Sequence, residues 1–138
     1  MLKDNIAFMR EGLVRFENTG ALFPTSKWAV KELIRPLYSR SRPMKILELG
    51  PGSGAVTVQI LERMLDGDEL LVCEINPRFM RLLKSRLRKL PLYHKRKKQI
   101  HFFCGPAQEL AEKEHFDFIV CAIPFLNFDL KTVQEIFG

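Results

Sequence analysis

The stretch ELGPGSGA, residues 48–55, decides how this chain folds. It follows an apolar run, Lys45-Ile46-Leu47, and precedes a segment with helical periodicity. Glycine occupies three of the five positions from Gly50 to Gly54. A backbone without side chains can adopt left-handed conformations and approach a ligand closely. The stretch therefore predicts a ligand-binding turn between a buried strand and a helix.

From Met44 onward, apolar runs typical of buried strands alternate with helical patterns. This alternation predicts an α/β fold, a Rossmann-like doubly wound sheet that is mainly parallel. The expected strands are Met44–Leu49, Glu69–Ile75, Ile100–Cys104 and Phe116–Ala122, and the expected helices are Ala55–Leu65, Pro77–Leu90 and Ala107–Lys113. The last helical pattern starts at Leu130 and stops at Gly138. We therefore expect four strands of a sheet that is incomplete at its C-terminal edge, where a second copy of the chain is one candidate cover.

Helical segments precede the first strand. A spacing of alternately four and three residues, which places side chains on one face of a helix, separates Leu2, Ile6, Met9, Leu13 and Phe16. Thr25 or Ser26 is expected to cap a second helix that runs through Ile34. We expect one domain, 1–138, with a helical segment over 1–43 and the Rossmann core over 44–138.

Composition excludes several classes of protein. The chain has no run of about 18 apolar residues, as a membrane span requires, and its N-terminus does not resemble a signal peptide. A cytoplasmic protein is therefore expected. The three cysteines, Cys73, Cys104 and Cys121, form no C-x-x-C unit, so buried thiols are expected and a metal site is not.

The turn at residues 50–54 is compatible with several ligands. It lacks the spacing of a phosphate-binding P-loop, but Gly50, Gly52 and Ala55 fit the G-x-G-x-x-A dinucleotide pattern. Glu74 ends the second expected strand, 20 residues after Gly54. A carboxylate there can accept both hydroxyls of a ribose, whereas the plain alternative is a surface glutamate.

The motif at residues 48–54 resembles the first motif of Rossmann-fold methyltransferases that use S-adenosylmethionine. In that family an acid two positions before the first glycine, here Glu48, helps to hold the methionine ammonium. Three further stretches resemble bacterial phospholipid N-methyltransferases, which methylate phosphatidylethanolamine to phosphatidylcholine: NTGALFPTSK at 18–27, CEINPRF at 73–79 and AIPFLNF at 122–128.

The resemblance implies a set of site residues and no metal. The residues expected to bind S-adenosylmethionine are Thr25, Ser26, Glu48, Gly50, Pro51, Gly52, Ser53, Gly54, Glu74, Ile75, Asn76, Gly105, Pro106, Ala107 and Ala122. The candidates for positioning the amine in catalysis are Pro124, Phe125 and Asn127. Gly105-Pro106-Ala107 stands where family members have Gly-Asp-Ala, so the adenine is expected to meet backbone groups or Gln108.

Other functions remain open at this point. The ribosomal RNA adenine dimethylases share the fold, but their fourth motif begins with an Asn where this chain has Ala122. Without that Asn a flipped base loses its main specific contact. N-methylation of a phospholipid amine is therefore the first prediction and RNA adenine N6-methylation the second. Methylation of a small-molecule or protein amine, a cofactor-binding module without turnover and a dehydrogenase are the remaining alternatives.

Positive charge is concentrated in one segment. Arg78–Lys98 holds ten of the 22 Lys/Arg and none of the 16 Asp/Glu, so it carries +10 and the rest of the chain −4. Phe79, Leu83, Leu87 and Leu90 are expected to form the apolar face of its helix. Lys95-Arg96-Lys97-Lys98 is expected to be a loop that contacts an anionic partner, a membrane lipid in preference to RNA. The protein is thus expected to bind peripherally at the inner face of the membrane.

Overall fold

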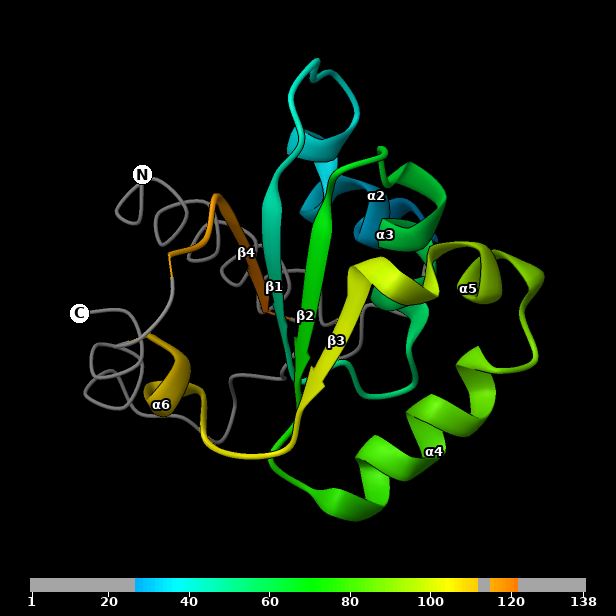
Figure 1. The fold of residues 1–138 in the computed structure, drawn as a ribbon, viewed down its shortest axis with the longest axis vertical. Helices are drawn as coiled ribbons and strands as arrows, with labels where there is room; N and C mark the ends of the chain where they lie inside the picture. The colour runs from blue at the N-terminus through cyan, green and yellow to red at the C-terminus, as the bar shows by residue number, and fades with distance from the viewer. Residues whose placement is uncertain (1–26, 112–114, 122–138) are drawn as a thin grey trace.

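The computed structural model describes residues 27–111 and 115–121, and Figure 1 traces their elements. In chain order these are α2 (Lys27–Leu33), the 3-10 turn η1 (Arg35–Leu37), β1 (Lys45–Leu49), α3 (Ala55–Arg63), β2 (Glu69–Cys73), α4 (Pro77–Leu87), α5 (Pro91–Arg96), the 3-10 turn η2 (Lys97–Gln99), β3 (Ile100–Phe103), α6 (Ala107–Ala111) and β4 (Phe118–Cys121). The predicted helix Leu2–Phe16 and the cap at Thr25 or Ser26 lie outside the described residues.

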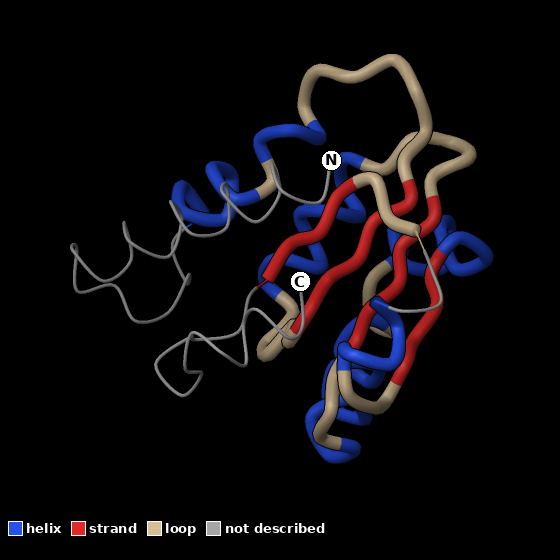
Figure 2. Tube along the Cα trace, turned by 90° about the vertical axis from the view of Figure 1, so that its left-hand side faces the viewer, coloured by secondary structure: helices blue, strands red, loops and turns tan. Residues whose placement is uncertain are grey.

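The four strands form one parallel sheet in the order β3-β2-β1-β4, and they run side by side in Figure 2. Leu47 in the middle of β1 is paired with Leu71 of β2 and with Ile119 of β4. The chain leaves β1 toward β2 and β3 and later returns to the other side of β1. Ligands of open parallel sheets bind where the strand order reverses in this way. The predicted doubly wound parallel fold is confirmed.

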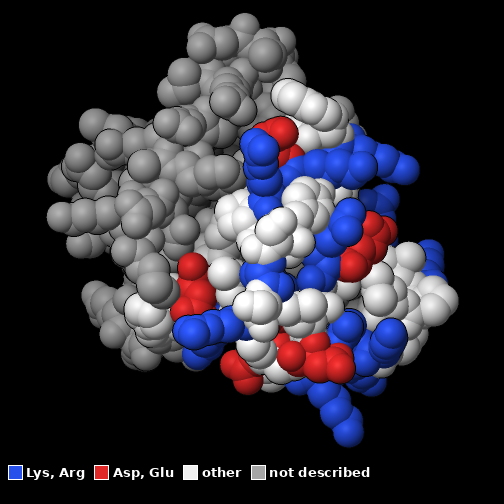
Figure 3. All heavy atoms as spheres, turned by 90° about the horizontal axis from the view of Figure 1, so that it is seen from above, with Lys and Arg blue, Asp and Glu red and all other residues white. Residues whose placement is uncertain are grey.

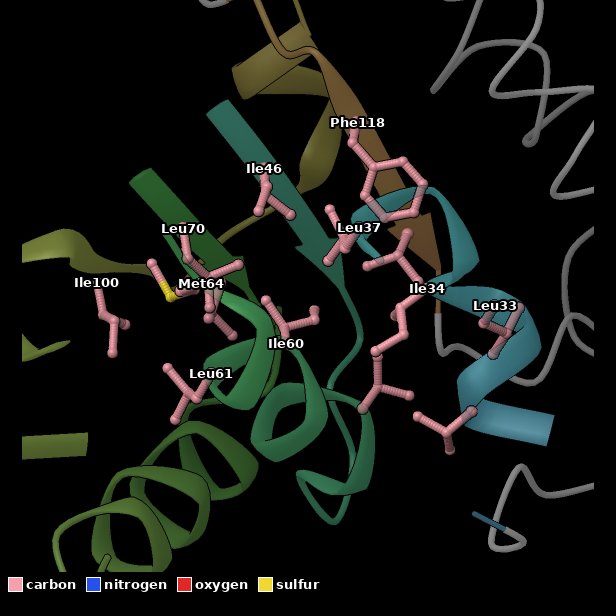
Figure 4. Close-up of a cluster of buried hydrophobic side chains, with 14 of the residues drawn as sticks. Leu33, Ile34, Leu37, Ile46, Ile60, Leu61, Met64, Leu70, Ile100 and Phe118 are labelled. Carbon is pink, nitrogen blue, oxygen red and sulfur yellow. The ribbon is translucent and has the colours of Figure 1, made fainter. Parts of the chain in front are cut away.

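Both faces of the sheet are covered, as the continuous apolar strands predict. On one face Ile46, Leu70 and Phe118 pack against α2, α3 and α4 in the larger apolar core, part of which is drawn in Figure 4. On the other face Leu47 and Ile119 pack against Leu110 of α6. Because consecutive strand residues point to opposite faces, each strand contributes to both cores.

The helix expected over Pro77–Leu90 ends at Leu87, and a second helix, α5, follows it. Leu90 has extended backbone angles, φ −100° and ψ 123°, because it precedes a proline, and α5 then starts at Pro91. The loop expected at Lys95–Lys98 is therefore wrong, since Lys95 and Arg96 end α5 and Lys97 and Lys98 lie in η2. The second strand is also shorter than predicted, because β2 ends at Cys73.

Two predictions about burial need correction. The buried face of α4 consists of Met80, Leu83 and Leu87, whereas Phe79 is 49% exposed and not part of the expected face. Cys104 is exposed, although Cys73 and Cys121 are buried as predicted. The spacing of four residues between Phe79, Leu83 and Leu87 predicts one shared face, but Phe79 lies at the flank of the face that Met80, Leu83 and Leu87 bury.

A buried ion pair holds the amino end of the sheet together. Asp68, in the turn before β2, has a fully buried side chain that Arg40 meets with both terminal nitrogens. Its two carboxylate oxygens also accept the backbone N–H groups of Met44 and Leu65, each at 2.7 Å. Asp68 therefore joins its own turn to the segment Arg40–Met44, which lies 24 to 28 residues earlier in the chain.

Candidate functional site

Three loops meet at the carboxyl end of the sheet, after β1, β2 and β3. Backbone hydrogen bonds join them: the N–H of Gly50 donates to the carbonyl of Cys73 at 2.9 Å, and the N–H of Gly105 donates to the carbonyl of Glu74 at 3.2 Å. The N–H of Glu74 in turn donates to the carbonyl of Phe103 at 3.1 Å. The predicted site loops are thus one connected structure at the end of the sheet where ligands bind.

The glycines of the first loop are required by its backbone. Gly50, Gly52 and Gly54 have φ values of 61°, 54° and 88°, which lie in the left-handed region that favours glycine. A Cβ on Gly54 would meet Cδ1 of Leu83 in α4 at 2.8 Å, whereas a Cβ on Gly52 would meet nothing within 4 Å. Gly54 therefore lets α4 pack closely, and Gly52 leaves open space beside the loop.

Alanine at these two glycines is expected to have different effects on stability. Both substitutions strain a left-handed backbone, at about 1–2 kcal/mol each, but only Gly54→Ala also displaces the buried Leu83. Urea unfolding should give the larger loss for Gly54→Ala, by about a further 1 kcal/mol. Equal losses for the two variants would contradict the role of Gly54 in packing α4.

Glu48 lies fully buried below this loop. Its Oε2 accepts a hydrogen bond of 2.7 Å from the hydroxyl of Thr57, in the first turn of α3. Its Oε1 is buried and has no hydrogen-bond partner among the residues described. Burial raises the pKa of Glu48 to about 7, although the bond from Thr57 opposes this shift. An unsatisfied buried carboxylate oxygen fits a cationic ligand group, which would restore its charge and its hydrogen bond.

Glu74 follows β2 directly and is nearly buried, so it is not the surface glutamate of the plain alternative. Its Oε2 accepts the backbone N–H of Asn76 at 2.8 Å. Asn76 caps α4, because its Oδ1 accepts the backbone N–H of Arg78 at 2.9 Å. Between them Ile75 is 68% exposed at the rim of the site. One carboxylate oxygen of Glu74, Oε2, thus stabilises the turn after β2. The other, Oε1, accepts none of the hydrogen bonds among the described residues and can accept one from a ligand hydroxyl.

The third loop packs closely on β3. A Cβ on Gly105 would meet the ring of Phe103 at 2.9 Å, and the carbonyl of Gly105 accepts a bond from the thiol of Cys73 at 3.4 Å. Burial, with the charges of Glu74 and Cys104 beside it, raises the pKa of Cys73 to about 11. Because the thiol stays protonated at neutral pH, Cys73 is a packing group and not a nucleophile.

The structure brings together most of the predicted cofactor residues: Glu48, Gly50, Pro51, Gly52, Ser53, Gly54, Glu74, Ile75, Asn76, Gly105, Pro106 and Ala107. Thr25, Ser26, Ala122, Pro124, Phe125 and Asn127 lie outside the described residues. Thr57 was not among the predicted site residues, although a hydroxyl in the first helical turn after the Glu48–Gly54 motif could have indicated it. Arg86, whose guanidinium donates to the carbonyl of Ser53, was not among them either.

Two negative findings bear on the chemistry of this part of the chain. Across 27–111 and 115–121 there is no group of three or more His, Cys, Asp or Glu placed to bind a metal ion. No helix within the same ranges is long and apolar enough to cross a bilayer.

Comparison with known proteins gives a family for this chain and several relatives. A family model for a methyltransferase domain matches residues 46–138. An ornithine lipid N-methyltransferase of Singulisphaera acidiphila is 24% identical over 136 residues, which are 99% of this chain and 70% of that protein. A probable dimethyladenosine transferase of Drosophila melanogaster is 34% identical over 80 residues, 58% of this chain and 24% of that protein.

Solved structures show the same fold. The glycopeptide N-methyltransferase MtfA in complex with S-adenosyl-L-homocysteine has a TM-score of 0.62 at 20% identity, covering 83% of this chain and 45% of that one. The Podospora anserina methyltransferase PaMTH1 bound to the same ligand has a TM-score of 0.62 at 24% identity, covering 91% and 55%. The chain therefore has the Rossmann-like methyltransferase fold and spans about half the length of these two solved chains.

Proposed function

Because this chain belongs to the methyltransferase domain family, whose cofactor is S-adenosylmethionine, we propose that it N-methylates the amine headgroup of a phospholipid of the phosphatidylethanolamine type. The observation that carries the proposal is the extent of the match to the lipid N-methyltransferase, which aligns with 99% of this chain. The match to the dimethyladenosine transferase stops at 58% of it.

The residues at the carboxyl end of the sheet fit the cofactor. The unsatisfied Oε1 of Glu48 would receive the methionine ammonium, and Glu74 would accept the ribose hydroxyls. The loop at Gly50–Gly54 would let the backbone approach the methionine, and Ile75 would contact the cofactor at the rim. When bound, S-adenosylmethionine supplies an electrophilic methyl group. The protein contributes binding, alignment and the exclusion of water. Under these conditions the acceptor amine, in its neutral form, can attack the methyl group.

The methyl acceptor requires binding residues of its own. Pro124, Phe125 and Asn127 are the residues proposed to position the amine. Lys95, Lys97 and Lys98, which the sequence predicts to contact an anionic partner, are exposed. Arg96 of the same cluster differs, because it donates to Asp66 at 2.6 Å and to the carbonyl of Met64 at 2.9 Å. A cytoplasmic protein bound peripherally to the inner membrane face would suit this substrate.

RNA adenine N6-methylation is the second candidate, favoured by the 34% identity to the dimethyladenosine transferase. The test is a comparison of acceptors with radiolabelled S-adenosylmethionine: phosphatidylethanolamine in detergent, an ornithine lipid in detergent, and ribosomal RNA. We expect label in phosphatidylethanolamine. Label in the ornithine lipid alone would show that the acceptor is the ornithine headgroup instead of phosphatidylethanolamine. Label in RNA alone would overturn the proposal.

Glu74→Ala is expected to weaken binding of S-adenosylhomocysteine by tenfold or more, because hydrogen bonds to a charged group contribute about 1.5–3 kcal/mol. Glu69→Ala is the matched control, since Glu69 is exposed at the other end of the same strand. Calorimetric titration measures both variants. Unchanged affinity in Glu74→Ala would remove the ribose assignment.

A further inference from the structure

Two large apolar side chains on α4 point away from the core. Phe79 is 49% exposed and Leu82 is 60% exposed, although α4 buries Met80, Leu83 and Leu87 on its other face. Residues three apart are neighbours on a helix, so Phe79 and Leu82 form one exposed apolar pair.

Cationic side chains border this pair. Arg78 and Arg81 lie beside it and are exposed, and no acidic residue occurs between Arg78 and Lys98. A helix that combines exposed apolar side chains with cations suits the interface of an anionic membrane, where both can be satisfied at once. Leu82 makes this surface less suited to RNA, because an aliphatic side chain offers no ring on which a base can stack.

The exposed pair lies at the cofactor end of the molecule. α4 starts at Pro77, directly after the loop that contains Glu74, and its first turns therefore lie at the carboxyl end of the sheet (Figure 1). Arg86, one turn after Leu82, donates to the carbonyl of Ser53 in the glycine loop. Residues four apart share a side of a helix, so Leu82 is on the side of α4 that is turned toward this loop.

The Lys95–Lys98 cluster lies at the opposite end of the sheet. Arg96 is bonded to the turn that precedes β2, and η2 leads directly into the first residue of β3. Figure 3 looks onto this end and shows Lys and Arg interleaved with Asp and Glu. A five-residue strand is about 16 Å long, which exceeds the Debye length of about 8 Å at physiological ionic strength. Charges at this end therefore contribute little attraction when the cofactor loops face a membrane.

We propose that the first two turns of α4, with Arg78, Phe79, Arg81 and Leu82, are the surface that docks on an anionic phospholipid bilayer and turns the cofactor loops toward the headgroups. The proposal rests on the proposed function, in which the methyl acceptor is a lipid amine. Docking by this surface presents the site to a headgroup without extraction of the lipid. Docking by the Lys95–Lys98 cluster would turn the site away from the bilayer.

Co-sedimentation of the full chain with vesicles of phosphatidylglycerol and phosphatidylethanolamine tests the proposal. Phe79→Ser with Leu82→Ser should weaken vesicle binding by about tenfold or more through lost apolar contact. Arg78→Gln with Arg81→Gln should weaken it by about tenfold or more, because each cation near an anionic membrane is worth about fivefold. Lys97→Gln with Lys98→Gln is the matched control, since it removes the same charge, and should cost less than about threefold.

Unchanged binding of S-adenosylhomocysteine shows that each variant is folded. Equal losses in the Lys97/Lys98 and Arg78/Arg81 variants, or no binding of the wild-type chain to vesicles, would overturn the proposal. Loss of RNA binding and not of vesicle binding in the α4 variants would also overturn it.

Methylation of detergent-dispersed phosphatidylethanolamine separates the two proposals, because that assay needs no bilayer. If it proceeds while the α4 variants still bind vesicles, the docking surface is wrong and the function stands. If it fails while the α4 variants lose vesicle binding, the docking surface stands and the function is wrong.

Discussion

Asp68→Ala is expected to lower the free energy of unfolding by about 3–5 kcal/mol, the range for breaking a buried ion pair on one side. The substitution leaves the guanidinium of Arg40, whose side chain is almost fully buried, without its carboxylate. It also removes the acceptor for the backbone N–H groups of Met44 and Leu65. Urea unfolding at neutral pH measures the loss.

Asp66→Ala is the control for this prediction. Asp66 lies two residues away and also pairs with an arginine, Arg96, but its side chain is fully exposed. An exposed pair contributes about 1 kcal/mol or less. Similar losses in both variants would contradict the account of the amino end of the sheet.

The pH dependence of Asp68 gives the same prediction a second test. Burial alone would raise its pKa, but hydrogen bonds from Arg40, Leu65 and Met44 outweigh burial and hold the pKa below the usual 3.8. A depressed carboxyl pKa contributes stability that is present above the unfolded value and is lost as the pH falls below it. The stability from this group should therefore disappear below about pH 4 in the wild-type chain, and Asp68→Ala should lack that part of the acid transition.

Glu48→Gln is expected to stabilise the free chain and to weaken cofactor binding. The folded-state pKa of Glu48, about 7, is raised above the ordinary 4.5. The stability linked to this group is therefore fully present below pH 4.5 and is lost as the pH rises to about 7. At pH 8 the uncharged glutamine should raise the free energy of unfolding by about 3 kcal/mol, and at about pH 4.5 the two chains should be similar.

The same substitution removes the proposed partner of the methionine ammonium. Loss of one member of a buried charge pair costs about 2 kcal/mol or more, so S-adenosylhomocysteine should bind roughly thirtyfold less tightly at pH 8. In the wild-type chain the affinity should fall about tenfold for each pH unit below 7, because Glu48 must lose its proton to pair with a cation. A glutamine chain with wild-type affinity and pH profile would contradict the role of Glu48.

Much of the fold could be predicted from local sequence. The apolar runs around Ile46, Leu71 and Val120 are strands because both faces of a parallel sheet are buried, which leaves a continuous apolar pattern. The glycine loop is recognisable in the sequence because the left-handed φ values that it adopts admit few residues other than glycine. Glu74 could be predicted from its distance of 20 residues from Gly54, because the length of one helix–strand unit fixes that distance.

The remaining features depend on contacts between distant segments. Arg40 and Asp68 are 28 residues apart, and neither belongs to a sequence motif from which their ion pair could be predicted. The exposure of Phe79 depends on how α4 is rotated on the sheet, where Met80, Leu83 and Leu87 form the buried face. The position of Lys95–Lys98 at the amino end of the sheet could not be predicted from the sequence. It follows from α5 and η2, which connect α4 to β3.

The most direct test of the central claim, that the carboxyl-end loops bind S-adenosylmethionine through Glu48 and Glu74, is a calorimetric titration with S-adenosylhomocysteine and with NADH as the control ligand. The account predicts that the wild-type chain binds S-adenosylhomocysteine and not NADH, and that Glu48→Gln and Glu74→Ala each lose affinity while Glu69→Ala does not. Binding of NADH in preference, or no binding of S-adenosylhomocysteine by the folded wild-type chain, would contradict it.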